Sequence, residues 1–595
     1  MSAFGSLPEL LIALPAMLVL VTAIAAAFAF IMHHFSPRVK FLECLFMAPG
    51  IGLSASAWLA LIIKSFPFMR KGVAPETVWL TAIVQAAIAS VYWRSVLSKL
   101  KNNPEISEDL RRHRSSLIML GVMAVWWAYM SWIHYLLPRG SEHLTGGSVY
   151  ADLPFHLNLT TSFLDGINEM AHVFSSLMSS FYAGVTLAYP FMPDFYLSVL
   201  YAGGMTLRWA LVSTSAILLS SLFALIYIFN FRWSDSVRVG ALSVWLTLFA
   251  GGIGGFYYVS DKPDWYTIDN LTNSVFMHGP DHVLYWVRGM SAMWFSLPAH
   301  ILFPQRTVQH AYPLAVSALL LIYNGTSGKP APELKSNESS TEPQIAGGSD
   351  EEGELIQGKQ YEKEIVQRKN NLQTGGRSRT YVAATTSRLN EDQVIAGSAA
   401  AGSTAASGGA PSTIIKPTKP NIPFSHKSQR NLFFFAGFVT ALIPLMQPHS
   451  YVSIGVVILI VAIVQVVVLT VQTLCCSGAR ADGSWFSETK REGAPDFRRD
   501  VIETIIEWAC FGALALALGF PQFAKHFLHR VTFGVGSRGN GFVRYSPSWA
   551  EEGKGETPQT MWWKALGFFV PLYIVSFFLL TSRTQRAFYL GCAAL

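Results

Sequence analysis

Long apolar runs recur along the chain and are separated by polar, often basic, stretches. Several of these runs reach the roughly 20 residues that an α-helix needs to cross the hydrocarbon core of a bilayer. We predict eleven spans, at about residues 7–32, 41–63, 78–93, 115–137, 207–229, 239–259, 308–323, 431–446, 451–474, 501–520 and 561–580. The pattern therefore predicts an all-α, polytopic transmembrane helical bundle.

The stretch 285–303 is the ambiguous part of this pattern. It is apolar but short, and Pro304-Gln305-Arg306 interrupts it before the next run. We interpret it as a re-entrant or interfacial segment, followed by one span at about 308–323. The alternative is two spans, which would move Arg306 to the opposite side of the membrane. Both topologies of 283–325 stay open at this stage.

Composition changes sharply between 326 and 430, where Gly, Ser, Ala, Lys and Glu dominate. Such a segment cannot bury enough apolar surface to offset its chain entropy, so we predict a long disordered cytosolic linker. The linker divides the chain into an N-terminal three-span unit (1–114), a core with an outer loop (115–325), the linker itself (326–430) and a C-terminal four-span unit (431–595).

Charge and composition support a membrane protein. Of the 595 residues, 51% are hydrophobic and only 14% charged, well below the quarter that is usual for soluble domains. The net charge of +7 does not indicate nucleic-acid binding, because the basic residues gather in short loops beside apolar runs, where they set orientation. With these loops in the cytosol, the loop at 147–208 faces the lumen or the exterior.

That loop, Gly147 to Arg208, carries the first candidates for chemistry. It is long, and its aromatic and aliphatic residues argue against disorder. Asp152, His156 and Asp194 are the catalytic candidates. Structural roles are the competing interpretation, because Asp152 and Asp194 each stand where a helix could start, and an aspartate there often caps it. A second predicted outer loop, 261–306, adds further acids and the arginines Arg288 and Arg306.

This set of groups suits a lipid-linked phosphosugar. Arginine binds phosphate through its planar fork and keeps its charge, which makes Arg288 and Arg306 candidate phosphate-binding residues, with Gln305 and Tyr189 beside them. A carboxylate within reach can take the proton from an acceptor hydroxyl. Asp152 and Asp194 could also hold a divalent cation, Mg or Mn, since both prefer oxygen ligands.

The same residues carry a family resemblance. The segments YADLPFHLNLTTSFLDG (150–166), LAYPFMPDFYLSVLYAGG (187–204), GGIGGFYY (251–258) and FPQR (303–306) resemble segments of uncharacterised prokaryotic membrane proteins of glycosyltransferase type. The chain thus resembles the GT-C class of integral-membrane glycosyltransferases, which use sugars linked to polyprenyl phosphate. The resemblance implies a loop aspartate as base or metal ligand, here Asp152, and phosphate-binding arginines. The family often has a pair of acids where Asp152 stands alone.

The leading hypothesis is a membrane glycosyltransferase that moves a sugar from a polyprenyl-phosphate donor to an acceptor on the lumenal or exterior face. The expected partners are membrane lipid and the lipid-linked donor, and the expected location is the endoplasmic reticulum or the plasma membrane. Two alternatives remain: a transporter or channel, with polar residues along a pathway through the bilayer, and a catalytically inactive membrane scaffold.

Overall fold

The computed structural model describes residues 11–248, 297, 301–326, 426–478 and 497–525, with short gaps at 37, 70–71, 141, 146–148, 150–151, 174, 182–183 and 188. All of them belong to one compact unit, Met1–Ala331 together with Phe424–Leu595. The central part of the predicted linker, most of the ambiguous stretch 285–303 and the predicted span at 561–580 lie outside the described residues.

The described residues are almost entirely helical, with one short hairpin. The first part contains α2 (Leu14–Phe35), α3 (Phe41–Lys64), the 3₁₀ turn η1 (Pro67–Met69), α4 (Pro75–Asn102), α5 (Pro104–Arg112), α6 (Arg114–His134), the antiparallel strands β1 (Leu137–Arg139) and β2 (Glu142–Leu144), α7 (Asp152–Ser162), α8 (Met192–Ala202), α9 (Leu207–Ser234) and α10 (Val237–Leu248). After the gap come α14 (Arg306–Thr326), α16 (His426–Ala441), α17 (Pro448–Gly478), α18 (Phe497–Leu514), the π-helical turn η4 (Ala515–Gly519) and α19 (Phe520–Phe523).

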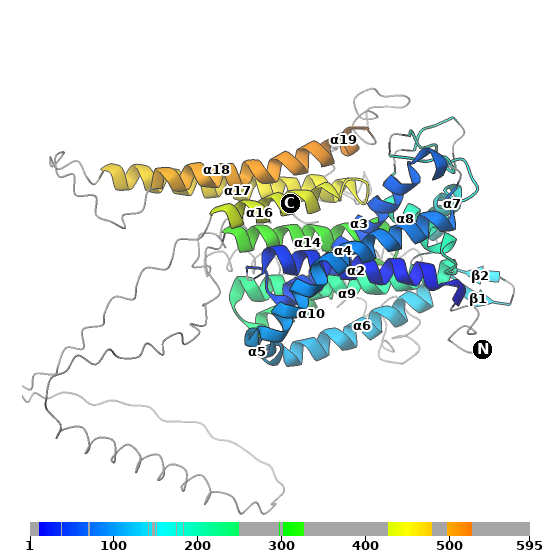
Figure 1. Ribbon diagram of the computed structural model, residues 1–595, viewed down its shortest axis with the longest axis horizontal. Coiled ribbons are helices and arrows are strands. Elements are labelled where there is room, and N and C mark those ends of the chain that lie inside the picture. The colour runs from blue at the N-terminus through cyan, green and yellow to red at the C-terminus, as the bar shows by residue number, and fades with distance from the viewer. Residues whose placement is uncertain are drawn as a thin grey trace, which may run out of the picture. The chain divides into compact units, whose positions relative to one another are not determined.

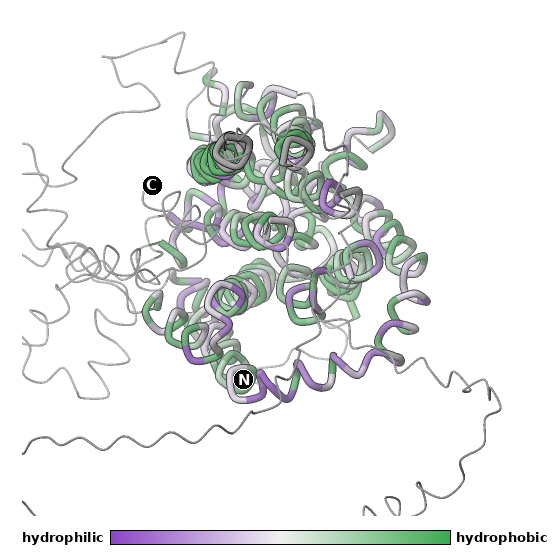
Figure 2. The backbone as a smooth tube through the Cα atoms, turned by 90° about the vertical axis from the view of Figure 1, so that its left-hand side faces the viewer, coloured by the Kyte–Doolittle hydropathy of each residue, from purple (hydrophilic) through white to green (hydrophobic). Residues whose placement is uncertain are grey.

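Seven of these helical segments are long and apolar enough to span a bilayer: α2, α3, α4, α6, α9, the Pro448–Val471 part of α17, and Val501–Phe523. The chain is therefore a multi-pass integral membrane protein. Viewed along the bundle, most helical turns carry apolar residues (Figure 2). Within the described residues, α10, α14 and α16, which fall on three more of the eleven predicted spans, do not reach that length and hydropathy.

The long helices run side by side, so that the connecting segments gather at two opposite ends of the bundle (Figure 1). We call these the α7 end, with α7 and the hairpin, and the α5 end, with α5. At the α7 end, Lys64 Nζ donates to the carbonyls of Glu169 and Ala171, and Lys525 Nζ donates to Ser175 O. At the α5 end, Arg112 pairs with Asp235 and Lys40 with Asp109. Lys64 is buried and is the last residue of α3.

Helix α14 lies in the centre of the bundle and contacts α3, α9, α16 and α17. It begins two residues earlier than the sequence pattern predicts, because Arg306 is its first residue rather than part of a loop. Arg306, Gln309 and His310 are all buried. Polar side chains inside a membrane bundle are costly unless they find partners, and they commonly mark function. This helix therefore sets the position of the candidate site.

Close helix contact at Gly52 permits a direct test of the packing. A Cβ added to Gly52 of α3 would lie 2.5 Å from the Ala23 carbonyl oxygen of α2. We expect Gly52→Ala to lower the free energy of unfolding by about 1–3 kcal/mol, the usual cost of overpacking. The matched control is Gly121→Ala in α6, where nothing lies within 4 Å, and where alanine should stabilise the helix by roughly 0.5–1 kcal/mol. Unfolding by sodium dodecyl sulfate in mixed micelles measures both, and equal shifts would contradict the packing.

Candidate functional site

An imidazole and a carboxylate form a buried pair between α7 and α8. His156 Nδ1 lies 2.9 Å from Asp194 Oδ1 and 3.0 Å from Asp194 Oδ2. The two side chains are 1% and 0% exposed. When a carboxylate is hydrogen-bonded to Nδ1 of a histidine, the other ring nitrogen, Nε2, can exchange protons with a substrate.

The local folding of α8 explains why Asp194 is available for this pair. Helix α8 begins at Met192, with Phe191 as its N-cap, and every residue from Met192 to Leu200 is buried. Asp194 therefore stands inside the first turn, not at the cap position. Proline at the second helical position suits a helix start, since its missing N–H would have no partner there. The structural interpretation of Asp194 as a helix cap is thus wrong, and its carboxylate faces His156.

Arg306 is a buried cation next to this pair. Its side chain is 1% exposed, and its charge interacts with that of Asp194. Its hydrogen bonds are long: Nη1 donates to Ser215 Oγ at 3.4 Å and Nη2 to Thr214 Oγ1 at 3.2 Å. Nε is buried and has no partner among the described residues. The guanidinium therefore does not reach water, as an arginine that anchored a helix at the membrane interface would.

Neutral hydrogen bonds hold the surroundings of Arg306 in place. Ser215 Oγ donates to Gln309 Oε1 at 2.7 Å, and Gln309 Nε2 donates to Tyr135 Oη at 2.9 Å and to Leu302 O at 2.6 Å. Tyr135 Oη in turn donates to Phe303 O at 2.9 Å. These contacts join α6, α9 and α14. They fix the guanidinium without neutralising it, because none of these partners carries a charge.

Tyr189 and Asp152 complete the group of predicted residues at this end. Burial, followed by the nearby charges of Asp194 and Asp152, raises the pKa of Tyr189, although a hydrogen bond with Thr307 opposes the shift. The phenol therefore stays protonated at neutral pH and can donate a hydrogen bond. Its ring lies against that of His156, with centroids 5.9 Å apart. Asp152, the first residue of α7, is exposed.

The structure thus brings together five of the predicted residues, namely Asp152, His156, Tyr189, Asp194 and Arg306. Gln305 lies just before α14 and makes backbone contacts with Ile301 and Val308. Arg288 lies outside the described residues.

Sequence reasoning missed several polar residues that support the site, above all Tyr135, Gln309, His310, Thr214 and Ser215. The available signal was a polar pair within an apolar run, as in Thr214-Ser215 and Gln309-His310. His310 Nδ1 lies 3.5 Å from Ser54 Oγ, and its Nε2 has no partner among the described residues. Polar residues inside predicted spans are thus as informative as those in the loops.

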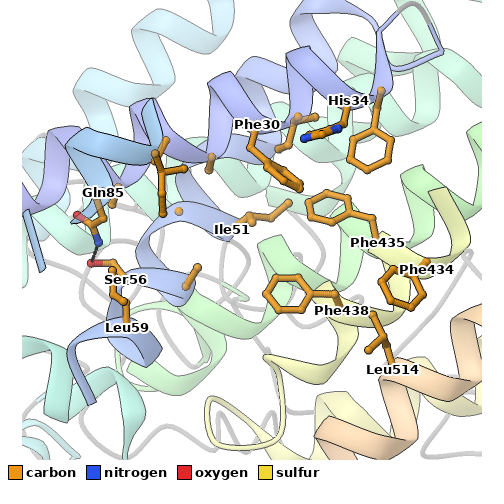
Figure 3. A pocket seen from close by; sticks show the side chains of 18 of the residues that line it. Phe30, His34, Ile51, Ser56, Leu59, Gln85, Phe434, Phe435, Phe438 and Leu514 are labelled. Carbon is orange, nitrogen blue, oxygen red and sulfur yellow. Dashed lines mark hydrogen bonds between the residues drawn. The ribbon is translucent and has the colours of Figure 1, made fainter. Parts of the chain in front are cut away.

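A polar track continues from His310 towards α2. The Tyr196 ring packs edge-on against His310, with centroids 6.3 Å apart, and its buried hydroxyl has no hydrogen-bond partner among the described residues. Gln85 Nε2 then donates to Ser56 Oγ at 2.6 Å, and Thr22 Oγ1 donates to Gln85 Oε1 at 2.9 Å. Gln85 and Ser56 stand in the wall of a mostly apolar cavity of about 530 Å³, which Phe30, Phe434, Phe435 and Phe438 also line (Figure 3).

The predicted Mg or Mn site is not complete in this part of the chain. Both carboxylate oxygens of Asp194 accept from His156 Nδ1, and Asp152 stands exposed at the start of α7. No three His, Cys, Asp or Glu residues gather within the described ranges in a way that could hold a metal ion. As arranged, these residues do not fit a divalent cation.

Comparison with known proteins adds no assignment: no protein-family model, curated protein or solved structure matches this chain.

Proposed function

We propose that the protein is a membrane-embedded glycosyltransferase that takes its sugar from a polyprenyl-phosphate donor and acts at the α7 end of the bundle. The observation that carries this proposal is the state of Arg306. Its guanidinium is fully buried, it holds only two long bonds to hydroxyls, and no carboxylate among the described residues lies within ion-pair distance. A buried cation with no carboxylate in direct contact is costly, and a bound phosphate would offset that cost.

The proposed reaction uses the neighbouring pair as the base. An acceptor hydroxyl gives its proton to His156 Nε2, while Asp194 holds Nδ1 and stabilises the imidazolium that forms. The acceptor oxygen bonds to the anomeric carbon as the bond from that carbon to the phosphate oxygen breaks. Arg306 and the Tyr189 hydroxyl stabilise the negative charge on the departing polyprenyl phosphate. Asp152, at the exposed side of the group, orients the acceptor or replaces His156 as the base.

A transporter is the second candidate, and the polar track is the observation that favours it. The depth of the track argues for the transferase. Ser54 lies ten residues from the α7 end of α3, and Gln85 lies ten residues from the α7 end of α4, which is about 15 Å of helix in each case. The track therefore runs sideways at one depth rather than from one end of the bundle to the other. The scaffold alternative depends on the predicted linker, of which residues 327–425 lie outside the described residues.

The test is sugar transfer by the full-length chain in proteoliposomes. Wild-type protein should release radiolabelled sugar from one of a panel of polyprenyl-phosphate hexoses. Arg306→Gln should raise KM for the donor and lower kcat/KM about 10²–10³-fold, the usual effect of losing one charge-stabilising donor. Arg114→Gln, at an exposed arginine of the α5 end, is the control and should behave as wild type. Unchanged transfer by a folded Arg306→Gln variant would reject the proposal, and uptake of intact substrate without transfer would favour the transporter.

A further inference from the structure

A second, larger cavity lies between the ends of α2, α6, α8 and α9, on the α7 side of the bundle. Its volume is about 1060 Å³, at the upper end of the range for ligand pockets. The walls are mostly aliphatic and aromatic, with Met17 and Val21 from α2, Leu157 from α7, Tyr201 from α8 and Ile217 from α9. Because these walls are apolar, water alone is a poor occupant.

The cavity opens onto the outer face of the bundle. Met17, Val21, Tyr201 and Trp209 line it and are also strongly exposed, at 43%, 63%, 46% and 38% of their surface. In a protein that spans a bilayer, exposed apolar side chains on the long helices α2 and α9 face lipid chains. A lipid chain can therefore enter this cavity sideways from the membrane.

One cation and two indoles stand at the end of the cavity. The Arg208 guanidinium carbon lies 3.5 Å from the centre of the Trp132 ring, and Nη2 donates to Trp132 O at 3.0 Å. The ring centroids of Trp132 and Trp209 lie 5.0 Å apart. Tryptophans of this kind mark the level of the lipid head groups.

Arg208 also has a hydrogen-bond donor that remains available to a ligand. In the described part of the chain, its buried Nε has no hydrogen-bond partner and no carboxylate lies within ion-pair distance of its guanidinium. His143 of β2 lines the same cavity. The planar, permanently charged fork of an arginine suits a phosphate-bearing lipid head group. The positive charge of Arg208, next to an apolar cavity, matches an anionic amphiphile rather than a neutral one.

We propose that this cavity binds one anionic glycerophospholipid, with an acyl chain among Met17, Val21 and Ile217 and the phosphate on Arg208. The site is distinct from the candidate active site, because the residues that line the cavity include none of Asp152, His156, Tyr189, Asp194 and Arg306. The inference does not depend on sugar transfer, and it survives if the proposed function fails.

The experiment is native mass spectrometry of the full-length protein, transferred from nanodiscs of phosphatidylglycerol, of phosphatidylcholine or of an equal mixture. From the mixture, wild-type protein should retain one phosphatidylglycerol and should prefer it to phosphatidylcholine at least tenfold. Arg208→Gln should lose this preference, whereas Arg94→Gln, at an exposed arginine of α4, should keep it. Ser213→Trp, which fills the cavity and leaves Arg208 in place, should remove the retained lipid altogether.

Three results would overturn the inference. Equal retention of both phospholipids by wild-type protein would show that the cavity selects only for apolar chains. Undiminished preference in a folded Arg208→Gln variant would remove the arginine from the site. Displacement of phosphatidylglycerol by an equimolar polyprenyl phosphate would assign the cavity to the sugar donor.

Discussion

Replacing Asp194 with asparagine is expected to lower kcat for sugar transfer about 10²–10⁴-fold, the range for loss of a positioned general base. The carboxylate accepts from His156 Nδ1 through both oxygens, which fixes the ring and its tautomer. An asparagine of the same shape can present its NH₂ group to Nδ1 and so favour the wrong tautomer. KM for the donor should not rise, because the change leaves Arg306 in place and removes a negative charge from its surroundings.

The division between kcat and KM separates this role from a structural one. Ser198→Ala is the matched control, since Ser198 lies one turn further along α8, is equally buried and donates only to the Phe195 carbonyl. It should leave both constants unchanged. His156→Gln should reproduce the loss in kcat, and the double variant should be no slower than either single one, because the two side chains act as a unit.

Comparison with Asp152→Asn then identifies the base. If His156 takes the proton, Asp152→Asn should lower kcat for sugar transfer less than Asp194→Asn does. A larger loss at Asp152 than at Asp194 would make Asp152 the base and leave the buried pair with a structural role. Equal kcat values for Asp194→Asn and wild-type protein would remove the pair from the mechanism.

The apolar pattern was sufficient to predict the long helices, and its errors have physical causes. The prediction of 41–63 differs from α3 by one residue. The prediction of 78–93 misses both ends of α4. At the C-terminal end, the helix continues through Arg94 and Lys99 beyond the apolar part. Lys99 Nζ reaches back to the carbonyls of Met32 and His33, so its charge does not end the helix. Apolar length measures the part of a helix that faces lipid and not the whole helix.

The chemistry was less accessible to the sequence. Asp152, His156 and Asp194 stand out as polar residues in a long predicted loop, and His156 follows Asp152 at position i+4. No periodicity relates His156 to Asp194, which is 38 residues away on another helix. Arg306 was predicted as a phosphate-binding residue of a loop, whereas its burial at the start of α14 depends on α9, almost a hundred residues earlier. Residues such as Tyr135 and Gln309 acquire a role only through such long-range contacts.

The buried ion pair at the opposite end of the bundle carries the largest expected effect on stability. Glu43 of α3 is 0% exposed, and its Oε1 lies 2.6 Å from Arg232 Nε of α9. Its Oε2 accepts from the Lys40 backbone N–H and from Asn324 Nδ2 of α14, both at 2.9 Å. One carboxylate thus joins three helices at the α5 end.

Glu43→Ala is therefore expected to lower the free energy of unfolding by about 3–5 kcal/mol, since it leaves the partly buried Arg232 without its counterion. Glu76→Ala is the control, because Glu76 is an exposed glutamate in the first turn of α4 and its loss should cost less than about 1 kcal/mol. Unfolding by sodium dodecyl sulfate in mixed micelles measures both variants.

The double variant Glu43→Ala/Arg232→Met decides how much of the loss comes from the uncompensated charge. Removing both charges should recover part of the stability lost in the single variant, because a buried charge without a partner costs more than no charge at all. The hydrogen bonds to Lys40 and Asn324 would still be missing, so recovery should be incomplete. A double variant as unstable as the sum of the two single variants would contradict the pairing.

The same three helices carry Ser54, Thr214, Ser215 and Arg306 towards the α7 end. Glu43→Ala should therefore also raise KM for the sugar donor, because looser helix packing would displace these side chains.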